Sequence, residues 1–401
     1  MNILQVHNKY RNIGGEWTVL EQEFELLKDK HQIEQYIVQN SEELRSIYRQ
    51  LRLIFTTHYN NKAAKVMHRK LGDGNYDLMH VHNFFPLLSP SILDAARNAG
   101  IPTVMSLHNF RLIHPNGLMY YKGKIDERSI EGSAYRCVWD GVYRDSVFQT
   151  AVTAHMIEYH RKNKTWQRVP SAFIALSEFS KDKFVQGGLP EERIFIKPNF
   201  LKDPLKEFSD LEIKENKKNR YLYVGRLSSE KGIQDLIDCW AEHSVDAELV
   251  IAGDGPLRGK LEKKLKTNRN IRWLGQIEKP KILSLLAESK ALIFPTRCYE
   301  GQPLIILEAM SMGCPVITSK IGNPQNIIDH ETNGLHFKPG SSDELFSRIE
   351  FMQNHPEKRK EMSRNARKSY LENYTPEQNY RTLMKIYEQA ADLEHQLAKQ
   401  F

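Results

Sequence analysis

Two carboxylates eight residues apart are the part of this sequence best suited to chemistry. Glu300 and Glu308 lie in the segment 298–310, which follows the apolar run 291–295. The pattern predicts a buried strand, a tight turn that holds Glu300, and a helix that holds Glu308. Eight helical residues span about 12 Å, which is too far for one acid/base pair on a single bond. The spacing suits a long ligand with hydroxyls at both ends, such as a nucleoside diphosphate sugar. The helix N-terminus between the two acids would attract the diphosphate.

This segment resembles the Glu-x7-Glu signature of retaining glycosyltransferases of the GT-B fold, in particular glycosyltransferase family 4. The spacing alone is weak, but the Glu-Gly-x-Pro turn and the later Gly-Cys-Pro at 313–315 make the match specific. The resemblance implies that Glu300 binds the sugar and Glu308 the ribose. It also implies donor contacts from Gly301, Gln302, Pro303 and Leu304. The alternative is that Glu300 caps a helix and Glu308 is solvated.

Arg226 and Lys231 are the leading candidates for holding the diphosphate. They follow the expected strand 220–224, and ligands of α/β sheets bind where parallel strands end. The segment 224–232 resembles the Gly-Arg-Leu-x5-Gly segment of the family, whose Arg and Lys bind the donor diphosphate. Asp-x-Asp, which holds Mg²⁺ in some transferases, does not occur in this sequence. The sequence therefore predicts a reaction that uses no metal and no cofactor, in which protein cations stabilise the leaving group. The alternative is two exposed cations.

The first half of the chain carries its own candidates after expected strands. Gly15 follows the strand 3–6, and a glycine lets the backbone approach a phosphate closely. The resemblance places Gly15 at the diphosphate and His108 near the donor sugar, where we expect His108 to act in catalysis with Glu300. Glu16, His82 and Arg111 are expected on the acceptor side. A structural role remains the alternative for each histidine.

Apolar runs alternate with helical patterns along the whole chain, which indicates two α/β halves with mostly parallel sheets. In the first half the expected strands are 3–6, 76–82, 103–108 and 172–176. In the second half they are 220–224, 247–252, 271–274 and 291–294. The polar stretch 209–220 is typical of a linker, and we place the boundary near 200–218. The resemblance implies a GT-B architecture, with two facing Rossmann-like domains and a terminal helix that crosses back. We place the domains at 1–203 (acceptor), 204–375 (nucleotide sugar) and 376–401 (the helix).

Composition limits the class of protein. The chain has 401 residues, a net charge of +7 and four cysteines without metal-type spacing, Cys137, Cys239, Cys298 and Cys314. No signal peptide and no apolar run of about 18 residues is evident, so we expect a reduced, cytoplasmic protein. The mild positive net charge is not accompanied by a recognised nucleic-acid-binding motif in the sequence. The segment 120–168, rich in Tyr, Trp, Lys and Arg, is expected either to contact the acceptor or the inner face of the membrane, or only to pack on the sheet edge.

The sequence therefore predicts a retaining transferase that moves a sugar from a nucleoside diphosphate sugar to a saccharide or lipid-linked acceptor of surface polysaccharide synthesis. The departing phosphate would help to deprotonate the acceptor, after the domains close over the donor. Two alternatives stay open. A nucleotide-sugar epimerase of the same fold would isomerise the donor without an acceptor, and a non-catalytic subunit would only bind it.

Overall fold

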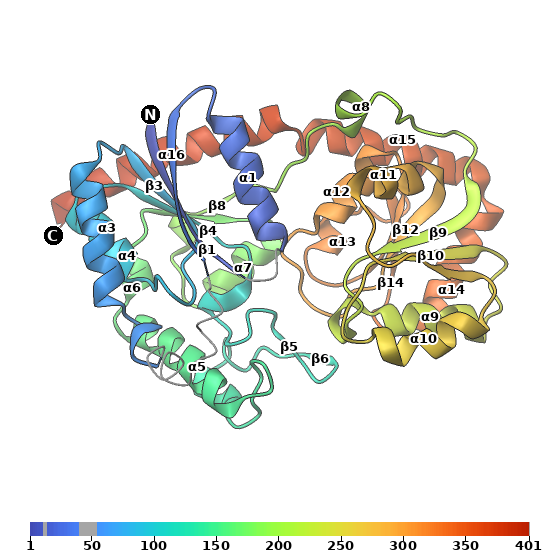
Figure 1. The fold of residues 1–401 in the computed structure, drawn as a ribbon, viewed down its shortest axis with the longest axis horizontal. Coiled ribbons are helices and arrows are strands. Elements are labelled where there is room, and N and C mark those ends of the chain that lie inside the picture. The colour runs from blue at the N-terminus through green and yellow to red at the C-terminus, as the bar shows by residue number, and fades with distance from the viewer. Residues whose placement is uncertain (11–13, 40–53, 401) are drawn as a thin grey trace. The chain divides into compact units, whose positions relative to one another are not determined.

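The computed structural model describes residues 1–10, 14–39 and 54–400. The chain divides into two compact units (Figure 1). Unit 1 comprises Met1–Met119, Asp126–Pro198 and Asn379–Phe401, and unit 2 comprises Tyr120–Ile125 and Asn199–Gln378. Among the described residues, no helix is long and apolar enough to cross a membrane.

The core of unit 1 is a parallel sheet of six strands in the order β2-β1-β3-β4-β7-β8. Its strands are β1 (Asn2–Lys9), β2 (Gln32–Gln39), β3 (Leu78–Asn83), β4 (Thr103–Ser106), β7 (Ala172–Ala175) and β8 (Ile194–Ile196). All residues of β3, β4 and β7 are buried, as expected for central strands that helices cover on both faces.

The unit 1 helices with defined bounds cover this sheet or extend from it. They are α1 (Gly15–Leu27), α3 (Asn61–Asp73), α4 (Ser91–Asn98), α5 (Val147–Lys162), α6 (Thr165–Arg168), α7 (Glu178–Gln186) and α16 (Pro376–Gln400), of which α16 joins unit 1 from Asn379. Polar side chains cap the N-terminal ends of several of these helices, because they accept hydrogen bonds from N–H groups that have no partner inside the helix. Asn60 caps α3, Ser146 caps α5 and Ser177 caps α7.

One face of the unit 1 sheet changes from apolar to polar along its strands. Side chains two residues apart point to the same face. On the face that α1 and α16 cover, the strands begin with Ile3, Leu78 and Val104, which share one core with Leu383 and Tyr387 of α16. Toward the carboxyl ends, the same face carries Gln5, His80, His82, Ser106 and His108. This polar strip positions the site described below.

Unit 2 repeats the architecture with the strand order β11-β10-β9-β12-β13-β14. Its strands are β9 (Lys218–Val224), β10 (Glu248–Ala252), β11 (Ile271–Trp273), β12 (Ser289–Phe294), β13 (Val316–Ser319) and β14 (Gly334–Phe337). Its helices are α8 (Pro204–Glu207), α9 (Ile233–Glu242), α10 (Arg258–Thr267), α11 (Lys279–Glu288), α12 (Leu304–Ser311), α13 (Pro324–Ile327), α14 (Ser342–Asn354) and α15 (Pro356–Asn373). Strand β9 alternates between two cores, since Tyr221 and Tyr223 pack in one and Leu222 in the other.

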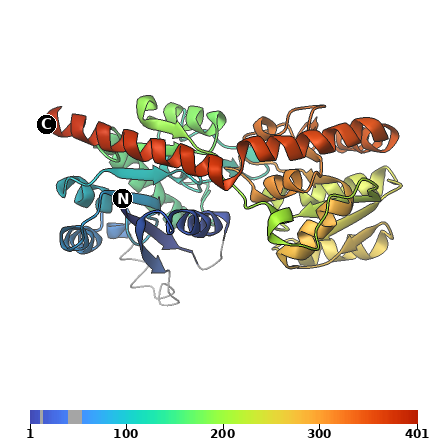
Figure 2. The same cartoon turned by 90° about the horizontal axis from the view of Figure 1, so that it is seen from above.

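The last helix completes unit 1 rather than the unit that precedes it in the chain. Leu383, Ile386, Tyr387 and Ala390 of α16 are buried in the core that contains Ile3. Figure 2 shows α16 running along unit 1. Glu394 near its end accepts a hydrogen bond from the Ser171 hydroxyl at 2.6 Å. The expected return of a terminal helix to the first half of the chain is confirmed.

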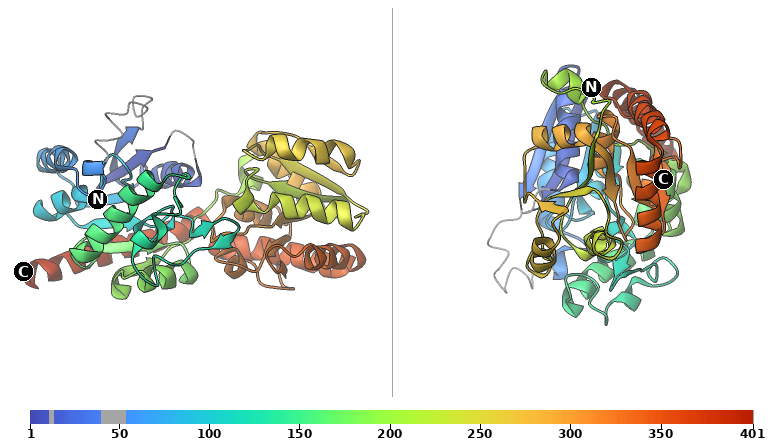
Figure 3. Two further views of the ribbon diagram at one scale, coloured as in Figure 1. Left: turned by 90° about the horizontal axis from the view of Figure 1, so that it is seen from below. Right: turned by 90° about the vertical axis from the view of Figure 1, so that its right-hand side faces the viewer.

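The segment 110–168 forms an excursion outside the sheet. It contains a two-stranded hairpin, β5 (Tyr120–Tyr121) and β6 (Lys124–Ile125), two short 3-10 helices at Phe110–Leu112 and Ala134–Cys137, and helices α5 and α6. Figure 3 shows α5 beside this irregular stretch. The hairpin residues 120–125 belong to unit 2, and the rest belongs to unit 1.

Candidate functional site

The centre of the candidate site in unit 2 is an ion pair. The Lys231 Nζ lies 2.6 Å from the Glu300 Oε1, and the Thr296 hydroxyl donates to the same oxygen at 3.0 Å. Lys231 follows β9 and Glu300 follows β12, and these strands are neighbours in the sheet. Their carboxyl ends therefore bring the two charges together. Burial acts to lower the pKa of Lys231, but Glu300 and nearby groups outweigh it and raise that pKa.

The turn after β9 has little freedom to vary. Gly232 has φ of +68°, and a Cβ there would lie 1.8 Å from the Pro295 carbonyl oxygen. Glycine is therefore needed to bring Lys231 against the end of β12. The main chain of Arg226 is fixed as well, because its carbonyl accepts the Tyr223 hydroxyl at 2.8 Å. The Arg226 residue itself is exposed, so its guanidinium stands where a ligand can reach it.

Helix α12 supplies an anion-binding terminus and an acid. It begins at Leu304, and no side chain caps it, so its first N–H groups are suited to an anion. The Gln302 side-chain oxygen accepts from the Asn199 N–H, and the Gly301 carbonyl accepts from Asn323. These contacts hold the turn and direct the Gln302 amide into unit 2. Any contact of Gln302 with a diphosphate would therefore come from its main chain.

Glu308 lies in the middle of α12 and is half-buried. Burial raises the pKa of its carboxyl to about 7, although Lys279 acts in the opposite direction. The structure thus separates the two acids of the sequence motif by environment. Glu300 is paired with a cation, whereas Glu308 is held mainly among neutral groups.

In unit 1, His108 is the outer end of a chain of buried polar groups. Its Nε2 lies 3.2 Å from the His82 Nδ1, and the His82 Nε2 lies 3.4 Å from a Glu23 carboxylate oxygen. The other Glu23 oxygen is 2.6 Å from the Lys197 Nζ. Burial lowers the pKa of His108 to about 4 and that of His82 well below its usual value, so both rings are neutral near pH 7.

A second group of unit 1 residues surrounds Glu16. The Asn83 side chain donates to the Glu16 carboxylate at 3.2 Å. Arg111 stacks on the rings of Phe85 and Tyr143, with centroid distances of 4.7 and 4.4 Å. Burial raises the pKa of Glu16 to about 7, against the attraction of Arg111 and Asn83. The structure therefore brings Glu16 and Arg111 into one electrostatic environment.

The remaining residues expected from the sequence lie in different surroundings. Gly15 starts α1, and a Cβ there would meet no atom within 4 Å, which leaves room beside the backbone. His82 is buried, with 3% of its surface exposed. We therefore connect it to a ligand only through His108.

Sequence reasoning missed Glu23 and Lys197, which are both fully enclosed. A signal was present for Glu23. It occupies the buried stripe of α1 together with Val19, Leu20 and Leu27, and an acid in such a stripe needs a partner. The partner lies 174 residues later in the chain, where Lys197 alone gives no local sign.

Two groups of described residues bring three potential metal ligands within 4.8 Å of one another. The first is Glu23, His80 and His82. Here the Lys197 ammonium already neutralises the carboxylate. Both His80 nitrogens are engaged, with the Tyr387 hydroxyl at 2.8 Å and the Ser106 hydroxyl at 2.9 Å. This group therefore does not fit a metal ion.

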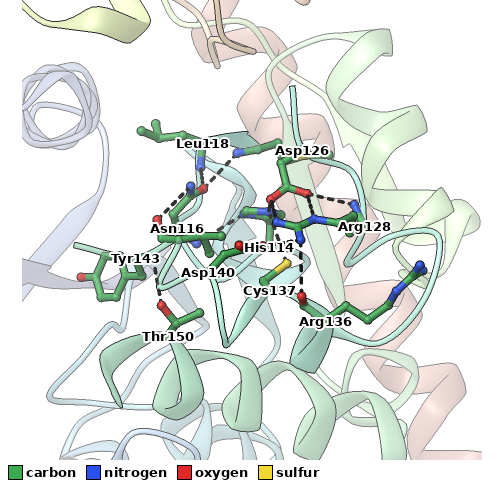
Figure 4. A network of polar contacts seen from close by, with 12 residues as sticks. His114, Asn116, Leu118, Asp126, Arg128, Arg136, Cys137, Asp140, Tyr143 and Thr150 are labelled. Carbon is green, nitrogen blue, oxygen red and sulfur yellow. Dashed lines mark hydrogen bonds and ion pairs between the residues drawn. The ribbon is translucent and has the colours of Figure 1, made fainter. Parts of the chain in front are cut away.

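The second group, His114, Asp126 and Cys137, is better explained as an ion-pair network (Figure 4). Arg128 donates to both Asp126 oxygens, at 2.9 and 2.8 Å. The His114 Nδ1 accepts from the Asn116 N–H at 3.3 Å. The proton of the neutral ring therefore lies on Nε2, 3.6 Å from Asp126, where a metal would need a bare nitrogen. The network fixes the fold of the excursion.

Comparison with known proteins is consistent with this arrangement. Residues 14–202 match the model of "Glycosyltransferase Family 4", and residues 206–369 match "Glycosyl transferases group 1". The alpha-D-kanosaminyltransferase of Streptomyces kanamyceticus is 26% identical over 300 residues, which cover 71% of this chain and 68% of that protein. The lipopolysaccharide 1,6-galactosyltransferase of Escherichia coli is 27% identical over 191 residues, 45% of this chain and 52% of that protein.

A solved structure shares the fold over almost the whole chain. The crystal structure of Anabaena Alr3699/HepE in complex with UDP-glucose has a TM-score of 0.63 at 19% identity and covers 98% of both chains. By contrast, the chain spans only about half the length of the Escherichia coli relative.

Proposed function

Because the chain belongs to glycosyltransferase family 4, we propose that it moves a sugar from a nucleoside diphosphate sugar to a saccharide or lipid-linked acceptor, with retention of configuration and without a metal. The observation that carries the donor half of this proposal is the Lys231–Glu300 pair beside the uncapped start of α12. It combines a cation, an oriented acid and free N–H groups at the end of one sheet.

The proposed roles in unit 2 follow from charge. Lys231, the exposed Arg226 and the first N–H groups of α12 bind the diphosphate and stabilise it as it leaves. Glu300 accepts hydrogen bonds from sugar hydroxyls. Glu308 binds the ribose hydroxyls, which a carboxyl group can do in either protonation state.

The proposed roles in unit 1 concern the sugar and the acceptor. His108 is neutral, and its ring nitrogen stabilises the positive charge that develops at the anomeric carbon. Gly15 offers its backbone to the diphosphate. Glu16 and Arg111 bind the acceptor, for which the neighbouring Phe85 and Tyr143 rings give an apolar wall.

The reaction proposed for these groups needs no protein nucleophile. The bond between the anomeric carbon and the diphosphate oxygen breaks, and the acceptor oxygen attacks the same face of the sugar. The departing phosphate takes the acceptor proton. The protein contributes binding, orientation and stabilisation of the separated charges.

We further propose that the segment 120–168 of the excursion contacts the lipid part of the acceptor or an anionic membrane. Trp139 is 87% exposed, and Tyr135 and Phe148 are each almost half exposed. Arg136 and Arg144 lie in the same excursion. Exposed aromatic rings among cations are suited to a membrane interface. Flotation with vesicles containing anionic lipid should retain the wild type and release Trp139→Ser.

A thermal-shift screen tests the donor assignment. UDP-, GDP-, ADP- and TDP-sugars are compared with chelator present, on the wild type and on Glu308→Ala. A ligand raises the unfolding temperature according to its concentration relative to its Kd. We expect one nucleotide series, tested first with UDP-glucose, to stabilise the wild type and to stabilise the variant less.

The outcome also separates the alternatives. Absence of any shift would contradict the donor site. Product analysis then decides the activity: sugar on a new molecule supports transfer, whereas an isomerised nucleotide sugar identifies an epimerase. Tight binding without either product identifies a non-catalytic subunit.

A further inference from the structure

A buried carboxylate lies two side chains behind His108 and has no role in the reaction described above. Glu23 has no exposed surface, and it is surrounded by groups from several elements. These are Lys197 after β8, His80 and His82 of β3, and Tyr387 of α16, while Asn379 of α16 accepts from Lys197. A buried charge is retained only where its partners compensate the lost hydration.

Two buried atoms of this network face each other, while the His80 Nδ1 lies farther off, 3.7 Å from the Glu23 Oε2, and is engaged with the Tyr387 hydroxyl at 2.8 Å. The Glu23 Oε2 and the His82 Nε2 are buried, make no hydrogen bond within normal limits to another described residue, and are 3.4 Å apart. Buried polar atoms are rarely left unpaired. An ionised carboxylate can only accept a hydrogen bond, so the proton of the neutral His82 ring lies on Nε2.

This assignment determines the next ring. With its proton on Nε2, His82 has a bare Nδ1, which can only accept. The atom that faces it at 3.2 Å is the His108 Nε2, which must therefore carry the His108 proton. The two rings are nearly parallel, 16° apart. The His108 Nδ1 is then left without a proton, as an acceptor for a ligand.

We propose that Glu23 is a positioning residue: through His82 it fixes the tautomer of His108, so that His108 presents a bare nitrogen to a sugar hydroxyl or to positive charge at the anomeric carbon. The assignment of His108 to the sugar rests on the proposed function, whereas the tautomer does not. Glu23 lies at 0% exposure, His82 at 3%, and His108 is half-buried, so the chain leads from the core outward.

Lys197 makes Glu23→Gln an informative variant. The ammonium of Lys197 can only donate, so it will hold the carbonyl oxygen of the introduced amide, just as it now holds the Glu23 Oε1 at 2.6 Å. The NH₂ group of the amide is then turned toward His82 and donates to Nε2. The His82 proton must move to Nδ1, and the His108 proton must move from Nε2 to Nδ1.

The experiment is nitrogen NMR of the histidine rings in the full chain labelled with ¹⁵N-histidine, with the His108 signals identified by their loss in His108→Gln. We expect protonated Nε2 in the wild type and protonated Nδ1 in Glu23→Gln. The matched control is Tyr387→Phe, which removes a hydroxyl from His80 in the same network and should leave the His108 pattern unchanged. An unchanged pattern in Glu23→Gln overturns the proposal.

A second readout is the rate at which nucleoside diphosphate is released from the nucleotide sugar that raises the unfolding temperature of the wild type. Glu23→Gln should lower kcat about 10- to 100-fold, by analogy with the loss caused by removing the groups that orient metal-ligating histidines, with donor Kd unchanged. In the His108→Gln background it should cause no further loss. A full additional loss would show that Glu23 acts only on the fold.

A variant that keeps the interior neutral covers the case in which Glu23→Gln does not fold. Glu23→Gln combined with Lys197→Met removes both charges of the pair. The carboxylate no longer imposes a proton position in this variant, so the single wild-type tautomer of His108 should be lost. Its persistence there would contradict the proposal.

Discussion

Arg226 and Lys231 stand five residues apart at the end of β9, yet their surroundings differ. The Lys231 Nζ forms an ion pair with the Glu300 Oε1 at 2.6 Å. Arg226 is exposed, and its carbonyl accepts from the Tyr223 hydroxyl and from the Ser228 N–H. A cation already paired with an acid orients that acid, whereas an exposed one is available to the charge of a ligand. We therefore assign the larger share of diphosphate binding to Arg226.

Arg226→Ala should lower kcat about 10²- to 10³-fold, the usual loss when one group that stabilises a transition-state charge is removed. Steady-state kinetics with the stabilising donor measure it. Arg272→Ala is the control, because Arg272 is an exposed cation of the same unit paired with Glu248 at 2.9 Å. Equal rates for Arg226→Ala and wild type would remove Arg226 from the site.

Glu308 makes the stability of the folded state depend on pH. Its pKa is about 7 in the folded chain, against an ordinary value of 4.5. Below about pH 4.5 both states hold the proton, so nothing is lost. As the pH rises toward 7 the unfolded chain loses its proton first, and the folded state loses stability until both are ionised.

Without ligand, the unfolding temperature of the wild type should therefore fall between pH 5 and 8 more than that of Glu308→Gln. Calorimetry of both proteins at pH 5 and at pH 8 measures the change in unfolding temperature. Glu372→Gln, a change at an exposed acid on α15, is the control and should keep the wild-type profile. Identical profiles for Glu308→Gln and wild type would contradict the shift.

At the scale of elements, most strands of the two sheets were predictable, including the edge strand β11, but two edge strands of unit 1 and the last two strands of unit 2 were not. β1, β3, β4, β7, β9, β10, β11 and β12 all lie within a few residues of runs expected from the sequence. The sheet strands that the sequence analysis did not predict are β2, β8, β13 and β14; β2, β8 and β14 are edge strands, whereas β13 lies between β12 and β14. β2, with the sequence QIEQYIVQ, contains no fully buried residue, and an edge strand needs no continuous apolar run because solvent covers one side.

The candidate site divides by the range of its contacts. The placement of Lys231, Glu300 and Glu308 after strands and on a helix was predictable because a local strand–turn–helix pattern carries it, and their roles stay a prediction. Glu23, Lys197 and the tautomer of His108 depend on contacts between distant parts of the chain, which no local pattern reports.

The turn after β9 gives a prediction at this scale. Gly232→Ala should destabilise the fold by more than about 2 kcal/mol, because the residue has φ of +68° and a Cβ would collide with Pro295. Gly259→Ala is the matched control. Gly259 lies in α10 with nothing within 4 Å, so alanine there should raise stability by about 0.5–1 kcal/mol. Urea unfolding of both variants compares them.

At the scale of the whole molecule, each unit has its own sheet and core, but unit 1 takes its last helix from beyond unit 2. Leu383→Ala should cost about 2–5 kcal/mol, since Leu383 is fully buried in the unit 1 core. Leu371→Ala makes the same change at a side chain of α15 that is 46% exposed and should cost far less. Thermal unfolding distinguishes them, and equal losses would contradict the packing of α16.

The position of α16 has a consequence for how the protein is made. A ribosome releases unit 1 strands first, yet the residues that cover them, from Asn379 onward, are translated after all of unit 2. The face that carries Ile3, Leu78 and Val104 therefore lacks the part of its cover that α16 provides while about 180 further residues are synthesised. All residues of unit 2, including the hairpin 120–125, are translated before Asn379. The half of the protein that is synthesised first is thus the half that finishes folding last.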